Sequence, residues 1–416
     1  MVGSGVAGLV SAHLLDEKHD VTLFEGDHRA GGHTNTVKVE VDGEVYTVDT
    51  GFIVYNERTY PAFVRLLLHL GVETKDSDMS FSVSDERTGL EWRGTSLSTL
   101  FAQQRNVANP GFHRMLLDVV RFNRAARRLA ADDNADPDLT LGEFLDHGRW
   151  SRQLVDWYLV PLGSAIWSAD PASFAEIPVA TFARFFDNHG LLRLGEQPRW
   201  RTIGGGAAHY VEAILRPLAG RVHLGARVEK VVRRPVDGTV ELRTEAGDLA
   251  EFDHVVFAIH SDQALRLLAD PSDAEREILG SIRYQPNRAT LHTDERFLPR
   301  ARRAWASWNY HRTGVDTGRA MVTYDLNRLQ GIESTRRILL TLNREDDIDP
   351  STILASFDYD HPVLDAAAVR AQRRRDEISG QRGTSFAGAH WGYGFHEDGV
   401  QSALHVARAL GVEPPW

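Results

Sequence analysis

Hydrophobic residues near the amino terminus predict a helix followed by a short buried strand. Apolar positions recur at helical spacing from Val6 to Leu15, so a helix should begin within residues 3–8. The run from His19 to Glu25 then reads as a buried strand that ends in an acidic residue. A glycine-rich turn, a helix and a strand in this order are typical of a nucleotide-binding α/β unit.

The middle of the chain predicts a hairpin and then a helical region. Valines alternate on both sides of the turn dipeptide Asp42-Gly43, as in a β-hairpin. Residues 112–130 form an amphipathic helix whose polar side carries arginines, namely Arg114, Arg121, Arg124 and Arg128. A capping box from Thr140 to Glu143 starts the next helix, and aromatic-rich helical segments continue to about Leu192. Such an insertion could cover an apolar ligand, although core packing explains most of its aromatic residues.

The second half predicts further strands and a final helix. A helix near 207–219 precedes a strand around Val228, a hairpin that turns at Asp237-Gly238, and a buried strand at 253–258. Residues 386–402 form a glycine- and aromatic-rich segment that is expected to precede a terminal helix.

Composition excludes several classes of function. The 416 residues include 58 acidic and 47 basic ones, for a formal charge of −11, which disfavours a nucleic-acid binder. The chain has no cysteine, so thiolate chemistry and a cysteinyl-linked cofactor are excluded, and no histidine spacing predicts a metal site. No apolar run is long enough to span a bilayer and no signal peptide precedes the first motif, so a cytoplasmic protein is expected.

The strongest motif is Gly3-Ser4-Gly5-Val6-Ala7-Gly8, which fits G-x-G-x-x-G. The first glycine permits a tight turn, the second lets the backbone approach a diphosphate, and the third lets helix and strand pack closely. Glu25 follows Gly3 by 22 residues, close to the spacing of about 20 for a carboxylate that binds ribose. The motif therefore predicts a dinucleotide site at the start of the helix.

The strand that normally precedes this motif is expected to be missing, because only Met1 and Val2 precede Gly3. That strand is usually central in the sheet. We expect the reading frame to continue upstream with about five to seven mostly apolar residues.

The residues that follow the strand point to a family. Arg29, Gly31, Gly32 and His33, after G-x-G-x-x-G and Glu25, resemble the extended dinucleotide motif of the flavin-containing amine oxidase superfamily, in which arginine usually stands at the place of His33. The resemblance implies FAD as the cofactor, and we expect it to be bound non-covalently through Glu25.

The same resemblance implies the fold and further cofactor contacts. It implies an α/β fold with a Rossmann-like FAD-binding domain (residues 1–75, 200–265 and 378–416), interleaved with an α+β substrate-binding domain (residues 76–199 and 266–377). Val228 would contact adenine through its backbone, and the closing motif would approach the flavin through Gly388, Asp398 and Gly399. The family often has an acid where this chain has Ala389-His390. His390 and His396 flank the motif as candidates for a catalytic or covalent-flavin role, although a supporting role is favoured for both.

The closing motif is similar to that of the FAD domain fused to plant cyclopropane-fatty-acid synthases. The amine oxidases usually place a lysine near the flavin, whereas this chain has no lysine after Lys230. We therefore expect oxidoreduction of a lipid or fatty-acyl chain, by desaturation or double-bond isomerisation, with Trp391 and Tyr393 as the candidates that face the flavin. An amine oxidase and a non-catalytic FAD-binding partner of a lipid methyltransferase are the alternatives. The arginine face of helix 112–130 could dock on an anionic membrane, although a solvated face is favoured.

Overall fold

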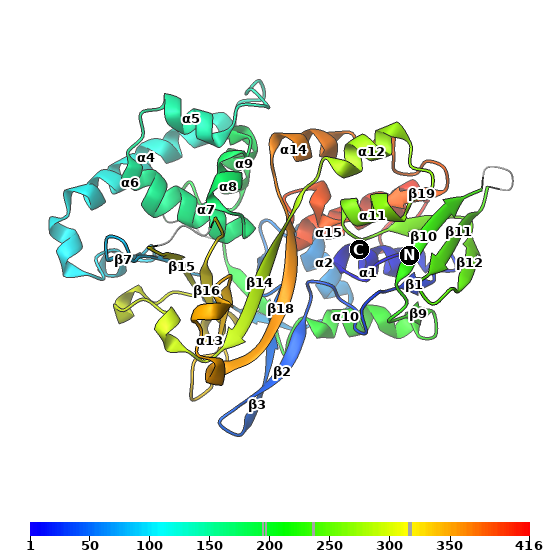
Figure 1. Ribbon diagram of the computed structural model, residues 1–416, viewed down its shortest axis with the longest axis horizontal. Helices are drawn as coiled ribbons and strands as arrows, with labels where there is room; N and C mark the ends of the chain where they lie inside the picture. Colours follow the sequence, from blue (N-terminus) through cyan, green and yellow to red (C-terminus); the bar gives the residue numbers. More distant parts are fainter. Residues whose placement is uncertain (194, 196–197, 235–237, 315–317) are drawn as a thin grey trace.

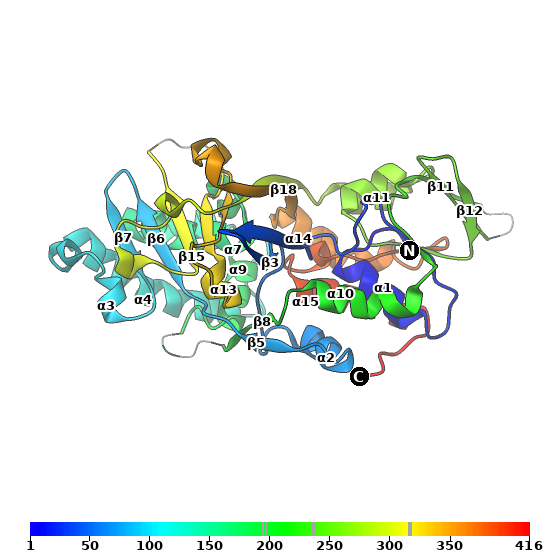
Figure 2. The same ribbon diagram turned by 90° about the horizontal axis from the view of Figure 1, so that it is seen from below.

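The computed structural model describes residues 1–193, 195, 198–234, 238–314 and 318–416 and has two lobes (Figures 1 and 2). One lobe carries both chain termini, and the other holds a large sheet with a layer of helices. Two long antiparallel strands, β14 (Tyr284–His292) and β18 (Ile353–Pro362), pair along their length and run from one lobe to the other. The lobes are therefore connected by paired backbone as well as by loops.

The first lobe is built on a parallel sheet and its covering helices. Its pairs are β1 (Leu23–Phe24) with β9 (Val222–His223), and β13 (Val255–Phe257) with β19 (Thr384–Phe386). The helices of this lobe are α1 (Val6–Leu15), α2 (Pro61–His69), α10 (Ala208–Leu215), α11 (Ser261–Leu267), α12 (Asp273–Gly280), α14 (Ala366–Arg373) and α15 (His396–Ala409). Helices α1, α2, α10 and α15 share one apolar core.

The expected absence of a first strand needs correction. Val2 forms parallel bridges to both Phe24 and Phe257, so it lies between β1 and β13, where the first strand belongs. The Val2 amide donates to Val256 O at 2.9 Å, and the Gly3 amide donates to Phe24 O at 2.8 Å. Val2 thus takes the place of the first strand, and the two hydrogen bonds hold Val2 and Gly3 against β13 and β1.

Three smaller antiparallel sheets accompany the parallel pairs among the described residues. The predicted hairpin is confirmed as β2 (Thr36–Val41) and β3 (Glu44–Asp49) around Asp42-Gly43. Strands β4 (Tyr55–Asn56), β8 (Trp200–Ile203) and β5 (Thr74–Asp76) form a second antiparallel sheet, and β10 (Val228–Arg233), β11 (Val240–Thr244) and β12 (Leu249–Phe252) form a third. The predicted turn at Asp237-Gly238 joins β10 to β11, but residues 235–237 lie outside the described part of the chain.

The second lobe contains a seven-stranded sheet in the order β18-β14-β17-β16-β15-β6-β7. All neighbours are antiparallel except β15 and β6. Its further strands are β6 (Phe81–Asp85), β7 (Leu90–Arg93), β15 (Trp308–Arg312), β16 (Val322–Asp325) and β17 (Leu339–Leu342). Its helices are α3 (Leu97–Leu100), α4 (Pro110–Ala130), α5 (Leu141–His147), α6 (Arg152–Leu154), α7 (Val160–Trp167), α8 (Pro171–Ala175), α9 (Val179–Asn188) and α13 (Leu326–Gln330). The helix predicted at 112–130 and the capping box of α5 are both present.

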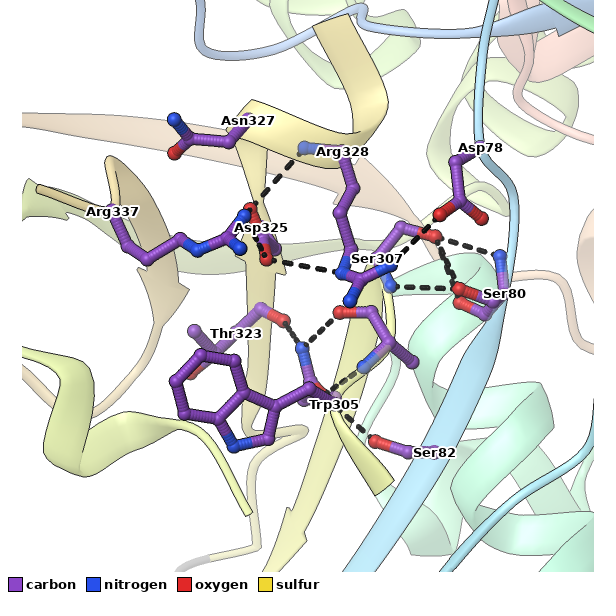
Figure 3. A network of polar contacts seen from close by, with 12 residues as sticks. Asp78, Ser80, Ser82, Trp305, Ser307, Thr323, Asp325, Asn327, Arg328 and Arg337 are labelled. Atoms are coloured by element: carbon purple, nitrogen blue, oxygen red, sulfur yellow. Dashed lines mark hydrogen bonds and ion pairs between the residues drawn. The ribbon is translucent and has the colours of Figure 1, made fainter. Parts of the chain in front are cut away.

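A buried polar network fixes the parallel pair β6 and β15 (Figure 3). The Ser80 amide donates to Ser307 Oγ at 2.7 Å, and the Ser307 amide donates to Ser80 Oγ at 3.0 Å. Nearby, the fully buried Asp325 pairs with Arg337 at 3.3 Å and caps α13 through the Arg328 amide. Because a buried polar group without partners costs about 1–3 kcal/mol, these reciprocal contacts hold the two strands in one register.

No helix among the described residues is long and apolar enough to cross a membrane.

Candidate active site

One large cavity extends from the first lobe into the second. Its volume is about 1370 Å³, and its lining combines the glycine motif of the first lobe with aromatic residues of the second. Single small-molecule sites usually measure about 300–1,000 Å³. The cavity therefore has room for a cofactor at one end and a further ligand at the other.

The glycine motif forms the floor of the first end. A Cβ atom at Gly3 would lie 2.6 Å from Ala258 O, and one at Gly8 would lie 2.0 Å from Gly3 O. Gly3 also has a φ of +95°, which L side chains rarely adopt. A Cβ at Gly5, in contrast, would meet no atom within 4 Å, so this residue faces open space. Gly8 lies outside the cavity lining and acts by letting α1 pack closely.

The amino terminus of α1 opens onto the same space. Gly5 is its N-cap and provides no side chain to cap the first turn, while Val6 and Ala7 line the cavity. The first amides of a helix lack partners within it and carry the positive end of the helix dipole. This terminus is suited to a diphosphate, as the motif predicts.

Glu25 lies beside this loop with its carboxylate already oriented. Its Oε2 accepts hydrogen bonds from the Ser4 amide at 2.9 Å and from the Ser4 hydroxyl, and its Oε1 accepts from the Asp27 amide at 2.9 Å. The carboxylate is half-buried and lines the cavity. Its remaining lone pairs can accept from ribose hydroxyls, which fits the role predicted from the spacing.

The Gly-Gly turn packs against the glycine motif. Gly31 and Gly32 both have positive φ, and a Cβ at Gly32 would lie 3.1 Å from the Cα of Gly5. Arg29 donates to Gly32 O at 2.8 Å and to Thr34 O at 3.3 Å. Arg29 therefore holds the shape of the turn while it lines the cavity, and the two motifs form one wall.

The later cofactor residues divide into two groups. Val228 and Gly388 line the cavity, as expected. Asp398 and Gly399 do not, because α15 begins at His396, within the segment that was expected to precede it. The Asp398 carboxylate accepts from the Phe395 amide at 2.9 Å, and burial raises its pKa to about 7. Gly399 faces α1, where a Cβ would lie 2.6 Å from Val6 Cγ1. Asp398 thus caps the start of α15, and Gly399 lets α15 pack against α1.

Four histidines line the cavity where the lobes meet. The His33 ring lies 5.4 Å from that of His361 and 6.4 Å from that of His260, and His390 completes the group across Tyr284. Burial lowers the pKa of each of the four, to about 4 for His361 and about 3 for His390, so all are neutral near pH 7. Nε2 of His390 is buried without a hydrogen-bond partner among the described residues, and its ring lines the cavity.

Sequence reasoning identified only two of these four histidines. His260 and His361 belong to no motif, and only their position at the ends of elements that meet in space brings them to the cavity. The cluster does not indicate a metal centre, because no group of three or more potential ligands with suitable placement occurs among the described residues.

His396 has structural partners. Its Nε2 lies 3.0 Å from Thr34 Oγ1 and 3.2 Å from the Tyr210 hydroxyl, and its ring stacks on Phe52 at 3.6 Å. Burial lowers its pKa to about 3. These contacts join the Gly-Gly turn, α10 and α15, as expected for a supporting histidine.

The two aromatic candidates, Trp391 and Tyr393, lie in different environments. Tyr393 lines the cavity and packs against Phe185 at 5.2 Å. Trp391 lies outside the lining, under Arg375, whose guanidinium carbon is 5.5 Å from the ring centroid. Of this pair, only Tyr393 can touch a ligand in the cavity.

The second end of the cavity, called here the apolar arm, is lined by the second lobe. Its lining residues come from strands β6, β7 and β15–β17 and helices α7 and α9, and from the loops beside them. They include Met79, Phe81, Trp92, Tyr158, Leu162, Ile166, Trp167, Phe185, His189, Trp308, Tyr324, Leu340 and Leu342. None of the arm residues named here carries a carboxylate. The acidic residues that line the cavity lie at the first end, on β18 of the seven-stranded sheet, or at Asp76, which is paired with Arg199.

Comparisons with known proteins agree with this geometry. AofH of Mycobacterium tuberculosis, whose name assigns it to the flavin-containing monoamine oxidases, is 26% identical over 284 residues, which cover 65% of this chain. The chain spans 58% of the length of that curated relative.

Solved structures share the fold over nearly the whole chain. A variant of putrescine oxidase superposes with a TM-score of 0.72 at 15% identity, covering 99% of this chain and 98% of that one. Cyclohexylamine oxidase from Brevibacterium oxydans gives 0.71 at 16% identity, with 99% and 98% covered. A fatty acid isomerase from P. acnes that produces CLA gives 0.69 at 17% identity, with 98% and 97% covered.

Residues 6–331 match the sequence profile of the flavin containing amine oxidoreductases, which is more than half of the chain. The glycine motif, Glu25 and the Gly-Gly turn supply a fitting site for FAD, the cofactor of that family. The chain belongs to the flavin-containing amine oxidoreductase family.

Proposed function

We propose that the chain is an FAD-dependent oxidoreductase that acts on an unsaturated or methyl-branched fatty-acyl chain. The observation that supports this proposal is the apolar arm, whose residues named above are aromatic or aliphatic apart from His189. An acyl chain gains about 0.8 kcal/mol for each CH₂ that it buries and needs no counter-charge. A protonated amine would lose hydration in such an arm without gaining an ionic partner.

FAD, when bound, supplies a two-electron acceptor for a hydride from a substrate C–H bond. Desaturation also releases a proton from the neighbouring carbon, and a base in the arm has to accept it. His189 is suited to this task, because it is the histidine among the described residues of the arm. Its Nδ1 donates to Phe185 O at 2.9 Å, so the neutral ring carries its proton there and leaves Nε2 as an acceptor.

Amine oxidation is the second candidate function, favoured by the names of AofH and of two of the similar structures. Two features of this chain argue against it. None of the residues named for the apolar arm is an acidic partner for an ammonium group, and no lysine occurs after Lys230. Arginine cannot replace a lysine base, because its pKa is too high for it to lose a proton.

The first test is an anaerobic screen of the FAD-loaded protein, in which loss of the oxidised flavin absorbance is followed with acyl and amine compounds. We expect bleaching by an unsaturated or methyl-branched acyl chain, and a faster reaction with longer chains that fill more of the arm. Polyamines and simple monoamines should leave the flavin oxidised. Bleaching by amines alone would favour the second candidate. An oxidised flavin together with a shifted double bond in the recovered acyl chain would indicate isomerisation, and an oxidised flavin with every compound recovered unchanged would favour a non-catalytic partner of a lipid methyltransferase.

The second test concerns His189 as proton acceptor. Burial lowers its pKa to about 4, so the ring is neutral and active above that pH. The bleaching rate should therefore stay constant between about pH 6 and pH 8 and fall as the pH approaches 4, because protonation removes the acceptor. His189→Gln should slow bleaching by about 10²–10⁴-fold without weakening acyl binding. The exposed His147→Gln on the same lobe is the control, and equal rates for both variants would exclude the role.

The third test concerns non-covalent FAD binding through Glu25. A hydrogen bond to a charged carboxylate contributes about 1–3 kcal/mol, and Glu25→Gln removes that charge. The affinity for FAD, measured by fluorescence titration, should therefore fall by at least about fivefold. Acid or heat should release all FAD from the wild-type protein into solution. The exposed Asp27→Asn, at the same end of the cavity, is the control. Unchanged affinity in Glu25→Gln, or flavin retained on the denatured chain, would contradict this prediction.

A further inference from the structure

The outer face of α4 is exposed to solvent and combines arginines with apolar side chains. Its exposed positions recur at helical spacing, and they are His113, Arg114, Leu117, Val120, Arg121, Arg124, Arg127 and Arg128. The opposite face is buried through Phe112, Met115, Phe122 and Ala126. A helix with one face in the core and an opposite face of this composition has the character of an interfacial amphipathic helix.

The apolar residues of this region are more exposed than core packing requires. Leu117 is 65% and Val120 49% exposed, while Leu97 on α3 is 76% and Val107 just before α4 is 59% exposed. Single exposed apolar residues are normal. Here, however, four of the nine large hydrophobic residues described as exposed lie between positions 97 and 120. Val107 lies beside α4, since its carbonyl oxygen is 2.7 Å from His113 Nε2, and Phe101 at the end of α3 contacts the His113 ring at 6.0 Å.

The arginines of α4 carry more positive charge than the acidic residue of the helix neutralises. The only acid of the helix, Asp118, is buried and pairs with Arg114 at 3.0 Å and with Arg121 at 2.5 Å. The side chains of Arg124, Arg127 and Arg128 have no hydrogen-bond or ion-pair partner among the described residues. This local excess of positive charge contrasts with the formal charge of −11 on the whole chain.

We propose that this α4 face, defined by Leu97, Val107 and the exposed residues of α4, docks on an anionic lipid bilayer. Each basic residue near such a surface contributes about 1 kcal/mol, and the apolar side chains can enter the interface between headgroups and acyl chains. The two contributions are complementary to a bilayer that carries negative charge. The acidic Asp132, Asp133 and Asp136 follow the helix, so contact is confined to the part before Ala131.

Docking at this face would place the bilayer next to the apolar arm. Phe122, on the inner side of α4, packs against Phe182 of α9 at 5.9 Å. Phe185, one turn further along α9, lines the apolar arm. Helix α4 thus contacts α9, which lines the cavity, and Figure 1 shows both helices in the helical layer of the second lobe. This consequence rests on the proposed function, whereas the docking itself does not.

The test is co-sedimentation of the full FAD-loaded chain with vesicles of saturated phosphatidylglycerol and phosphatidylcholine, compared with vesicles of phosphatidylcholine alone. Binding to the anionic vesicles and release by high salt are expected. The double variants Arg124→Glu/Arg128→Glu and Leu117→Ser/Val120→Ser should each lower the partition coefficient, the first by at least about tenfold. Because saturated vesicles offer no double bond and no turnover is measured, failure of this test is distinct from failure of the proposed acyl activity.

The control variant changes the same residue types outside the face. Arg276→Glu/Leu249→Ser alters an exposed arginine of α12 and a leucine of β12 that is 63% exposed. It should bind vesicles like the wild type. Equal binding by the α4 variants and the control, equal binding to neutral vesicles, or no binding at all would overturn the proposal. An α4 variant that lost an acidic protein partner but kept vesicle binding would also overturn it.

Discussion

The close packing of α1 against the loop before it is the constraint on which the site depends. A methyl group at Gly8 would lie 2.0 Å from Gly3 O, and one at Gly399 would lie 2.6 Å from Val6 Cγ1. Only hydrogen atoms at these two positions let the loop, α1 and α15 meet. The Gly-Gly turn packs equally closely, since a Cβ atom at Gly32 would lie 3.1 Å from the Cα of Gly5. The backbone amides at the first end of the cavity are therefore positioned by close glycine contacts, and Gly8 and Gly399 make these contacts without lining the cavity.

The two ends of the cavity have opposite chemistry because they belong to different lobes. The first end presents backbone amides, Glu25 and neutral histidines, all of which suit a polar cofactor. The second is bounded by a sheet and helices with apolar inner faces, and its β6–β15 wall is held in register by the buried serine pair Ser80 and Ser307. Strands β14 and β18 run from one lobe to the other and are paired by backbone hydrogen bonds, with one shift of register between Leu291 and His292, so the paired strands fix how the lobes are connected.

Local chemistry explains which features could be predicted from the sequence. The glycine motif, the hairpin at Asp42-Gly43 and the capping box at Thr140 each depend on residues adjacent in the chain, and all three are present. Features that depend on distant segments could not be predicted. Val2 acts as a strand only because β1 and β13 flank it, and His260 and His361 reach the cavity only through the packing of the lobes. Likewise, Trp391 and Tyr393 are two residues apart, yet only the fold determines that Tyr393 alone lines the cavity.

The central claim is that one cavity holds FAD at its polar end and an acyl chain at its apolar end. Four tryptophans line the cavity, namely Trp92, Trp167, Trp200 and Trp308, so a bromine-labelled fatty acid should quench their fluorescence in the FAD-loaded protein. The account predicts saturable quenching that an unlabelled fatty acid reverses and that a polyamine leaves unchanged. Quenching that does not saturate, or that a polyamine reverses as well as a fatty acid does, would contradict it.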